Sequence, residues 1–268
     1  MQNQKGNLMQ EQTTKIKDFN FPKVKADLIL SLGSQCRPAH HMRKNFLRAW
    51  ASPLDWMVNE NLDVIIHLFK TNFEDFFLSY ERLHSDNQNT ISVKDNINNI
   101  LSVHHFFHNE DLKIQAKRVN SQAIDRWKII KEKIIHSQNI VFIRSGNFNK
   151  TKTTEFLKKI SELFNNNNKN YYFINVNSSN KLAIDELNFE KTTINTSLTI
   201  INYNINENAC GAIGNKYFWT KMMRSIKVPL RFKTKNAIGD LKTRFIRSCK
   251  KRLRFFTKKY KNNIDESH

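Results

Sequence analysis

Short apolar runs alternate along this chain with longer amphipathic segments, and this alternation restricts the fold more than any other feature. Four runs are continuous and end in turn residues, which is typical of buried strands: 27–32, 139–143, 171–176 and 198–202. Apolar residues at helical spacing predict four helices: 35–46, 61–80, 113–136 and 151–164. Strands that alternate with helices form a mostly parallel sheet flanked by helices. The sequence therefore predicts an α/β fold.

The 268 residues divide by composition into one main domain and two terminal segments. Residues 1–23 are polar and predict a flexible N-terminal segment. Residues 24–230 hold the predicted strands and helices, a polar loop over 86–99 and a strand end over 104–107. We expect residues 24–230 to form one α/β catalytic domain. Residues 231–268 predict a basic amphipathic C-terminal tail.

Positive charge is concentrated in this tail. The chain has a formal net charge of +20, and residues 231–261 contain thirteen Lys and Arg against the single acid Asp240. From 237 to 260, apolar residues recur every three or four positions with basic residues between them, which predicts a C-terminal basic amphipathic helix. A basic excess attracts nucleic acid, anionic membrane surfaces or phosphorylated sugars. The apolar stripe favours an anionic membrane surface as the partner of 237–260, and no known binding motif supports nucleic acid.

Cysteine usage and the N-terminal residues predict a cytoplasmic protein. Cys36, Cys210 and Cys249 form an odd, sparse set without metal-ligand spacing, which fits a reducing compartment. The N-terminal residues lack the apolar core of a signal peptide, and no run approaches the ~18 apolar residues of a membrane-spanning helix. We expect a cytoplasmic location. The tail could hold the protein at the inner face of the membrane, or it could be a solvated, partly disordered tail.

The segment SLGSQCRPA (31–39) is the strongest candidate for chemistry. It follows a predicted strand and opens a predicted helix, so it lies at the carboxyl edge of the sheet, where sites gather. Amides at a helix N-terminus carry partial positive charge, which would lower the pKa of the Cys36 thiol and could stabilise an oxyanion. The alternative is that Cys36 is a small buried residue that closes a tight turn.

A nucleophilic cysteine needs a base, and three histidines gather in VHHFFHNED (103–111): His104, His105 and His108. In an extended segment His104 and His105 face opposite sides, so at most one of that pair can share a face with Cys36. Two histidines and a carboxylate could also hold a metal ion. However, no H-E-x-x-H or similar spacing occurs, so we expect no metal site.

An acid within SPLDW could complete the site. Asp55 lies between apolar residues, and a buried carboxylate needs a partner. It could pair with Arg43 or Arg48 for structural reasons, or it could orient the histidine.

Four residues are candidates for binding the substrate: Ser34, Gln35, Arg144 and Asn147. Arg144 and Asn147 end the 139–143 strand, and they share a sheet edge with Cys36 if the two strands are neighbours. Arg144 could then hold a carboxylate or a phosphate. The alternative is a plain strand-to-helix turn. The segment CGAIGN (210–215) lacks the signature of a phosphate-binding loop, so no nucleotide cofactor is expected.

The stretch SLGSQCRPAHHMRKNFLRAWASPLDWMV (31–58) resembles the opening motif of a bacterial family of unknown function, the putative papain-like cysteine peptidases. Family members begin S-L-G-S-x-C and reach S-x-P-F-D-W, for which this chain has SPLDW with Leu54 in place of Phe. Further matches are a His near aromatic residues, the strand NIVFIRS and the Trp of KYFW. The resemblance covers roughly residues 27–225.

The resemblance implies a nucleophile at Cys36, a base at His108 or His105, and Asp55 as a third polar member. Papain-like folds carry the Cys on a long helix and the His on a following antiparallel β-domain, whereas the periodicity of this chain predicts alternating strands and helices.

We therefore predict a hydrolase or acyl transferase with a Cys-His(-Asp) site, acting on a peptide, acyl or glycan substrate without a cofactor. The alternative is a membrane-peripheral enzyme of bacterial surface-polysaccharide assembly that transfers glycosyl or phosphosugar groups. In that case Cys36 is structural, and Arg144 and Asp55 form the site. A catalytically inactive binding module also stays open.

Overall fold

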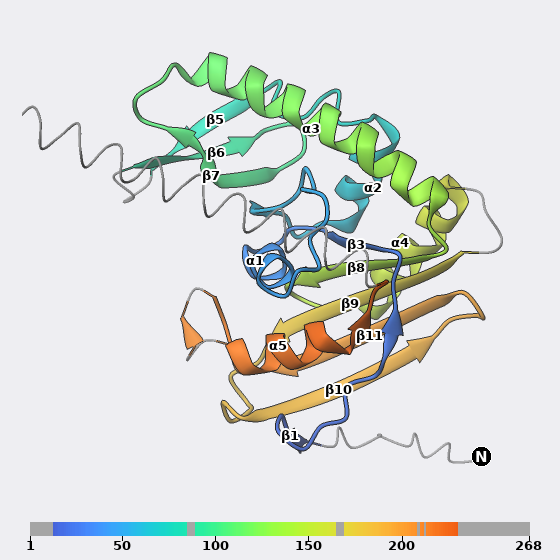
Figure 1. The fold of residues 1–268 in the computed structure, drawn as a ribbon. Helices are drawn as coiled ribbons and strands as arrows, with labels where there is room; N and C mark the ends of the chain where they lie inside the picture. Colours follow the sequence, from blue (N-terminus) through green and yellow to red (C-terminus); the bar gives the residue numbers. More distant parts are fainter. Residues whose placement is uncertain (1–12, 85–88, 165–168, 208–209, 212, 230–268) are drawn as a thin grey trace, which may run out of the picture.

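A mostly parallel sheet forms the centre of the fold. The computed structural model describes residues 13–84, 89–164, 169–207, 210–211 and 213–229. Within them, the main sheet has the order β1-β10-β11-β9-β8-β3 (Figure 1). Its strands are Thr14–Lys15 (β1), Glu186–Thr193 (β10), Leu198–Ile205 (β11), Asn170–Ser178 (β9), Asn139–Ser145 (β8) and Leu28–Ser31 (β3). Strands β3, β8, β9 and β11 are parallel neighbours, and β10 and β1 extend the sheet in antiparallel pairs. The predicted mostly parallel sheet is confirmed.

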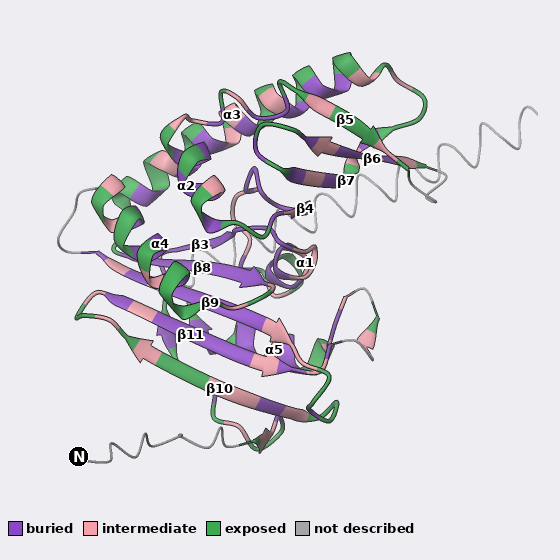
Figure 2. Cartoon of the chain, turned by 180° about the vertical axis from the view of Figure 1, so that it is seen from behind, coloured by how far each residue is buried: buried purple, intermediate pink, exposed green. Residues whose placement is uncertain are grey.

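Helices cover both faces of this sheet: α3 (Leu112–His136) and α4 (Lys150–Leu163) on one, α1 (Arg37–Lys44) and α5 (Lys216–Ser225) on the other. In β8, Ile140 and Phe142 face the core that contains α3 and α4, while Val141 and Ile143 face the core that contains α1 and α5. Successive residues of a strand point to opposite faces, so a strand covered on both faces is a continuous apolar run. Figure 2 shows these central strands buried and the outer faces of α3 and α4 exposed.

A second, antiparallel sheet lies beside the main one. Its order is β4-β7-β6-β5, and its strands are Met57–Val58 (β4), Ile100–Phe107 (β7), Thr90–Asp95 (β6) and Tyr80–Leu83 (β5). Helix α3 packs against β7 and continues along the core of the main sheet (Figure 1). One long helix therefore buries a face of both sheets.

Two local predictions are wrong in this region. The helix predicted over 61–80 ends early, since α2 is Leu62–Lys70 and Asn72 has a left-handed φ of 52°. A left-handed Asn just beyond the last turn commonly ends a helix. The loop predicted over 86–99 contains β6, in which every second residue is buried. A strand with one polar face has a loop-like composition, and only its period of two distinguishes it.

The described residues at the N-terminal side of the fold differ from the sequence prediction. Residues 13–23, which we assigned to a flexible segment, lie against the main sheet: β1 pairs with β10, and the side chains of Ile16 and Phe21 are buried. The amphipathic helix predicted over 237–260 lies outside the described residues. Among the helices that the structure describes, none has the length and apolar character needed to cross a membrane.

The turn after β3 is held by a close backbone approach. Gly33 has a φ of 77°, and an added Cβ would lie 2.9 Å from both the Leu54 and the Met57 carbonyl oxygens. The Gly33 N–H donates to Ser31 Oγ at 3.3 Å, and the Met57 N–H donates to the Leu54 carbonyl at 3.1 Å. The two halves of the opening motif, SLGSQC and SPLDW, are thus packed backbone against backbone.

We expect Gly33→Ala to destabilise the fold by about 1–3 kcal/mol more than Gly211→Ala, because it adds overpacking to the left-handed strain. Gly211 is a matched control: its φ is 67°, and an added Cβ would meet nothing within 4 Å. Urea unfolding of both variants measures the difference. Equal losses of stability would show that the backbone approach at Gly33 is not tight.

Candidate active site

Cys36 is the residue that begins helix α1. It follows the Gly33 turn as the N-cap of α1, no side chain caps the first turn, and Pro38 occupies its start. The thiol is half-buried, and this burial raises the pKa of Cys36. The neighbouring Arg37 and the backbone N–H of Cys36 lower that pKa by less. A thiol in this position is protonated at neutral pH unless another group takes its proton.

His104 is the histidine that reaches Cys36. Its Nε2 lies 3.1 Å from Cys36 Sγ, although the two residues are 68 positions apart. His104 comes from β7 of the antiparallel sheet, and Cys36 comes from the edge of the parallel sheet. The contact therefore joins the two sheets across an exposed face.

A bulge in β7 turns His104 outward. Ile91 pairs with Phe106 and Val93 pairs with Ser102, so a single residue of β6 lies opposite three residues of β7, 103–105. Ser102 and Phe106 flank the bulge and are both fully buried. Strict alternation would place His104 on their buried face, whereas a bulge re-aims side chains, often beside active sites.

The segment that links the Cys36 turn to β7 is SPLDW and the strand after it. Strand β4 pairs with β7, with Met57 opposite Ser102. The Trp56 ring meets the His104 ring edge-on, with centroids 6.0 Å apart and an interplanar angle of 90°. Gly33 touches the same segment from the other side. Residues 52–58 therefore fix the position of His104 relative to Cys36.

Asp55 is the buried acid of this segment. Its Oδ2 accepts from Arg48 Nε at 2.7 Å and from the Ser52 N–H at 2.9 Å. Burial raises the pKa of Asp55, and the adjacent Arg48 opposes that rise. The structure thus selects Arg48 over Arg43 as the partner of Asp55. Among the described residues, no hydrogen bond joins Asp55 to His104.

The two histidines that the sequence favoured as the base lie elsewhere. His105 Nδ1 is 3.0 Å from Ser102 Oγ, and burial, with a smaller contribution from Arg126, lowers the pKa of His105 to about 4. His108 lies beyond the end of β7, with its Nδ1 3.5 Å from Arg82 Nη2. Cys36 meets His104 instead. The outward turn at 103–105 could not be read from the sequence, because it depends on pairing with β6.

The predicted substrate-binding residues share the carboxyl edge of β3 and β8. Gln35 Oε1 accepts from Ser145 Oγ at 3.4 Å, so these two strand ends do lie together. Ser34 is buried, and its Oγ would lie 2.5 Å from a Cβ added to Gly146. Arg144 is also buried and donates from Nη2 to the Asn59 carbonyl at 3.0 Å. Asn147 is exposed at the same edge.

A buried polar cluster fixes the other side of α1. Glu207 is fully buried and accepts from Arg37 Nη1 at 2.6 Å and from Trp219 Nε1 at 2.7 Å. His41 stacks on Trp219 and donates from Nε2 to the Ile213 carbonyl at 2.8 Å. These bonds attach the helix that carries Cys36 to the loop before α5.

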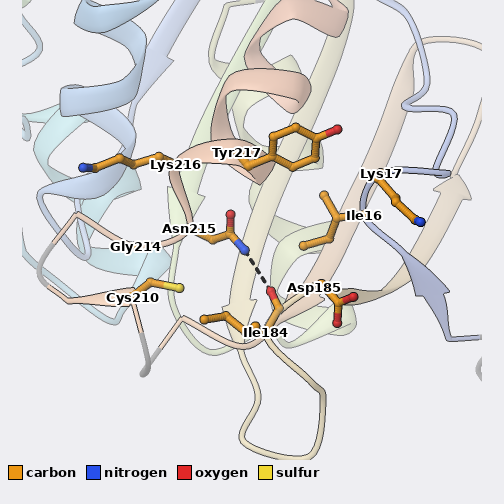
Figure 3. A pocket seen from close by; sticks show the side chains of 9 residues that line it. All are labelled: Ile16, Lys17, Ile184, Asp185, Cys210, Gly214, Asn215, Lys216 and Tyr217. Carbon is orange, nitrogen blue, oxygen red and sulfur yellow. Dashed lines mark hydrogen bonds between the residues drawn. The ribbon is translucent and has the colours of Figure 1, made fainter.

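A cavity of about 520 Å³ opens beside that loop (Figure 3). It lies between the start of α5 and residues 16–17, and its lining includes Cys210 and Tyr217. Neither Cys36 nor His104 lines it. No group of three metal-ligating side chains occurs within the part of the chain that the structure describes.

Burial lowers the pKa of His41 to about 4, with smaller contributions from the nearby charges of His40, Lys44 and Arg37. An unfolded histidine takes up its proton near pH ~6.5, so between pH ~6.5 and ~4 the unfolded chain binds more protons than the folded one. Stability therefore falls as the pH falls through this window. From about pH 6.5 to about pH 5, His41 should account for a loss of about 2 kcal/mol.

His41→Phe keeps a ring against Trp219 and should remove this part of the pH dependence. Urea unfolding of both proteins across the same pH range measures it, and His105 cancels because both proteins contain it. If the wild type and His41→Phe lose the same stability between about pH 6.5 and about pH 5, His41 is not the source of this pH dependence.

Comparison with known proteins bears on this site. A search of the curated proteins and a search of the solved structures each found no significant match. A family model matches residues 27–181, more than half of the chain, and this range contains Cys36, Asp55 and His104. The chain therefore belongs to the family described as "Putative papain-like cysteine peptidase (DUF1796)".

Proposed function

We propose that this protein is a cysteine hydrolase that cleaves a peptide-type carbonyl bond, with Cys36 as the nucleophile and His104 as the general base and acid. The observation that carries the proposal is the 3.1 Å separation of Cys36 Sγ and His104 Nε2. A nucleophile and its base need this hydrogen-bonding distance for direct proton transfer. Family membership supports the same chemistry.

The raised pKa of Cys36 gives His104 a necessary role. Burial keeps the proton on the thiol, so little free thiolate is present without a base. In the first step, His104 Nε2 takes the proton while the sulfur bonds to the carbonyl carbon and the π electrons move to the oxygen. When the intermediate collapses, the C–N bond breaks and the leaving amine takes the proton from His104.

A thioester to Cys36 remains, and water completes the reaction. His104 takes a proton from the water as the water oxygen attacks the thioester carbonyl. The C–S bond then breaks, and His104 returns the proton to the sulfur. The sum is one amide and one water converted to one carboxylic acid and one amine, with the enzyme unchanged.

The start of α1 supports binding of the oxyanion. The first backbone N–H groups of a helix lack intrahelical partners, and here no side chain caps them. The N–H of Cys36 lies beside its own sulfur, close to where the carbonyl oxygen would gain charge. Gln35 stands next to it, held by Ser145, and its amide can donate to a substrate.

The contacts of Arg144 and Asp55 favour this proposal over glycosyl or phosphosugar transfer. That alternative needs both side chains to meet a substrate. Arg144 is 4% exposed and bonded to a backbone carbonyl, and Asp55 is 1% exposed and paired with Arg48. Both side chains therefore have structural partners, whereas His104 is exposed beside Cys36.

An activated ester such as p-nitrophenyl acetate tests the proposal, because it acylates a competent thiol without knowledge of the natural substrate. We expect one acetyl group on Cys36, found by mass spectrometry of quenched reactions, followed by hydrolysis. Cys36→Ala should lose this adduct, and His104→Ala should acylate about 10²–10⁴-fold more slowly.

Cys210→Ala is the matched control, because Cys210 is the other free cysteine among the described residues. It should acylate like the wild type. Equal acylation rates for the wild type and His104→Ala, or acetylation spread evenly over the three cysteines, would count against the proposal.

A further inference from the structure

We propose that Trp56 is the positioning residue of the Cys36–His104 pair: it holds the imidazole in the orientation that points Nε2 at the sulfur. The inference rests on the proposed function and names the group that acts through His104. Its first support is the edge-on ring contact, with Trp56 and His104 centroids 6.0 Å apart. Aromatic rings in edge-on contact prefer one relative orientation, so the indole limits rotation of the imidazole.

The backbone of Trp56 gives independent support. Its φ is 68°, in the left-handed region that bulky residues rarely adopt. Such a conformation persists only where the surroundings impose it. Phe46, Phe73 and Phe77 share it away from the site, so the φ shows that Trp56 is held in place, and the ring contact shows what it is held against. A glycine or asparagine at this position would reduce the strain, yet the residue is Trp, which has the largest side chain of all amino acids.

The neighbours of Trp56 show what imposes the conformation. On one side, the Asp55 carboxylate is bonded to Arg48 and to the Ser52 N–H. On the other side, Met57 pairs with Ser102 of β7, and its N–H donates to the Leu54 carbonyl at 3.1 Å. Both flanking residues are fixed, so the left-handed turn aims the indole at the strand that carries His104.

The other contacts of His104 leave this role open. Its Nε2 faces Cys36 Sγ. Among the residues that the structure describes, no side chain or carbonyl hydrogen-bonds the second nitrogen, Nδ1, and Asp55 is committed to Arg48. The orienting group of a dyad is normally bonded to that second nitrogen. Here the Trp56 ring contact takes its place.

The orientation of the imidazole decides how well it takes the thiol proton. Its Nε2 must face Cys36 Sγ, as it does at 3.1 Å, for direct proton transfer. Trp56 should therefore raise the reactivity of Cys36 at neutral pH, and it should have no effect at alkaline pH, where the thiol ionises by itself.

The test is the rate of Cys36 alkylation by iodoacetamide across pH, followed by peptide mass spectrometry. This rate reports the reactivity of the thiol–imidazole pair and does not require catalytic turnover. We expect Trp56→Leu to lower the rate at neutral pH by about two- to fivefold, because the edge-on contact no longer orients the imidazole, and to leave the rate at high pH unchanged. Trp56→Phe keeps a smaller aromatic ring, so its alkylation rate should lie between those of the wild type and Trp56→Leu. It replaces Trp56→Leu in the test if that variant does not fold.

A double-mutant cycle separates positioning from a general structural effect. In a His104→Ala background, Trp56→Leu should have no effect on the alkylation profile, because Trp56 acts through His104. Phe46→Leu is the matched control: Phe46 is also aromatic, partly exposed and left-handed, with a φ of 58° at the end of α1. It should alkylate like the wild type.

An alkylation profile for Trp56→Leu that matches the wild type would overturn the inference. So would an equal loss of rate with and without His104. If Trp56 acts as expected but the activated ester leaves no acyl group on Cys36, the positioning role stands and the hydrolase proposal fails.

Discussion

The approach of Gly33 to the Leu54 and Met57 carbonyl oxygens connects the six-stranded main sheet to the four-stranded antiparallel sheet. It requires a residue without a side chain at a left-handed φ, and only glycine meets both conditions without strain. From this contact the chain runs through Trp56 into β4, which pairs with β7. Cys36 lies three residues after Gly33, and His104 lies two residues after the position that pairs with Met57. The backbone contact therefore sets the separation of the two reactive groups.

Electrostatics at the site depend on the same arrangement. Cys36 has a helix N-terminus and Arg37 beside it, both of which favour the thiolate, but burial outweighs them and raises the pKa of the thiol. Arg37 is itself bonded to the fully buried Glu207, so part of its charge is compensated. In the proposed function a partner base makes the sulfur nucleophilic, and the bulge in β7 brings His104 within reach of it.

The sequence was most informative where a strand is buried on both faces. NIVFIR, YYFINV and LTIIN are continuous apolar runs, and all three are strands of the main sheet. It was least informative for the antiparallel sheet, since β6 has one polar face and β5 is largely exposed. Cys36 could be singled out from the strand–turn–helix pattern. His104 could not be separated from His105 and His108, because the bulge that turns it outward depends on strand pairing. The antiparallel sheet that carries His104 was not predicted, because the periodicity of the chain indicated only alternating strands and helices.

The central claim is that Cys36 and His104 share one proton. A pH titration of the far-ultraviolet thiolate absorbance measures this directly, comparing the wild type with His104→Ala after subtraction of the Cys36→Ala spectrum from each. If His104 takes the thiol proton across the 3.1 Å contact, the thiolate forms as a hydrogen-bonded pair with the imidazolium, so the absorbance of Cys36 should appear at lower pH in the wild type than in His104→Ala. Titration curves that superimpose would contradict the account.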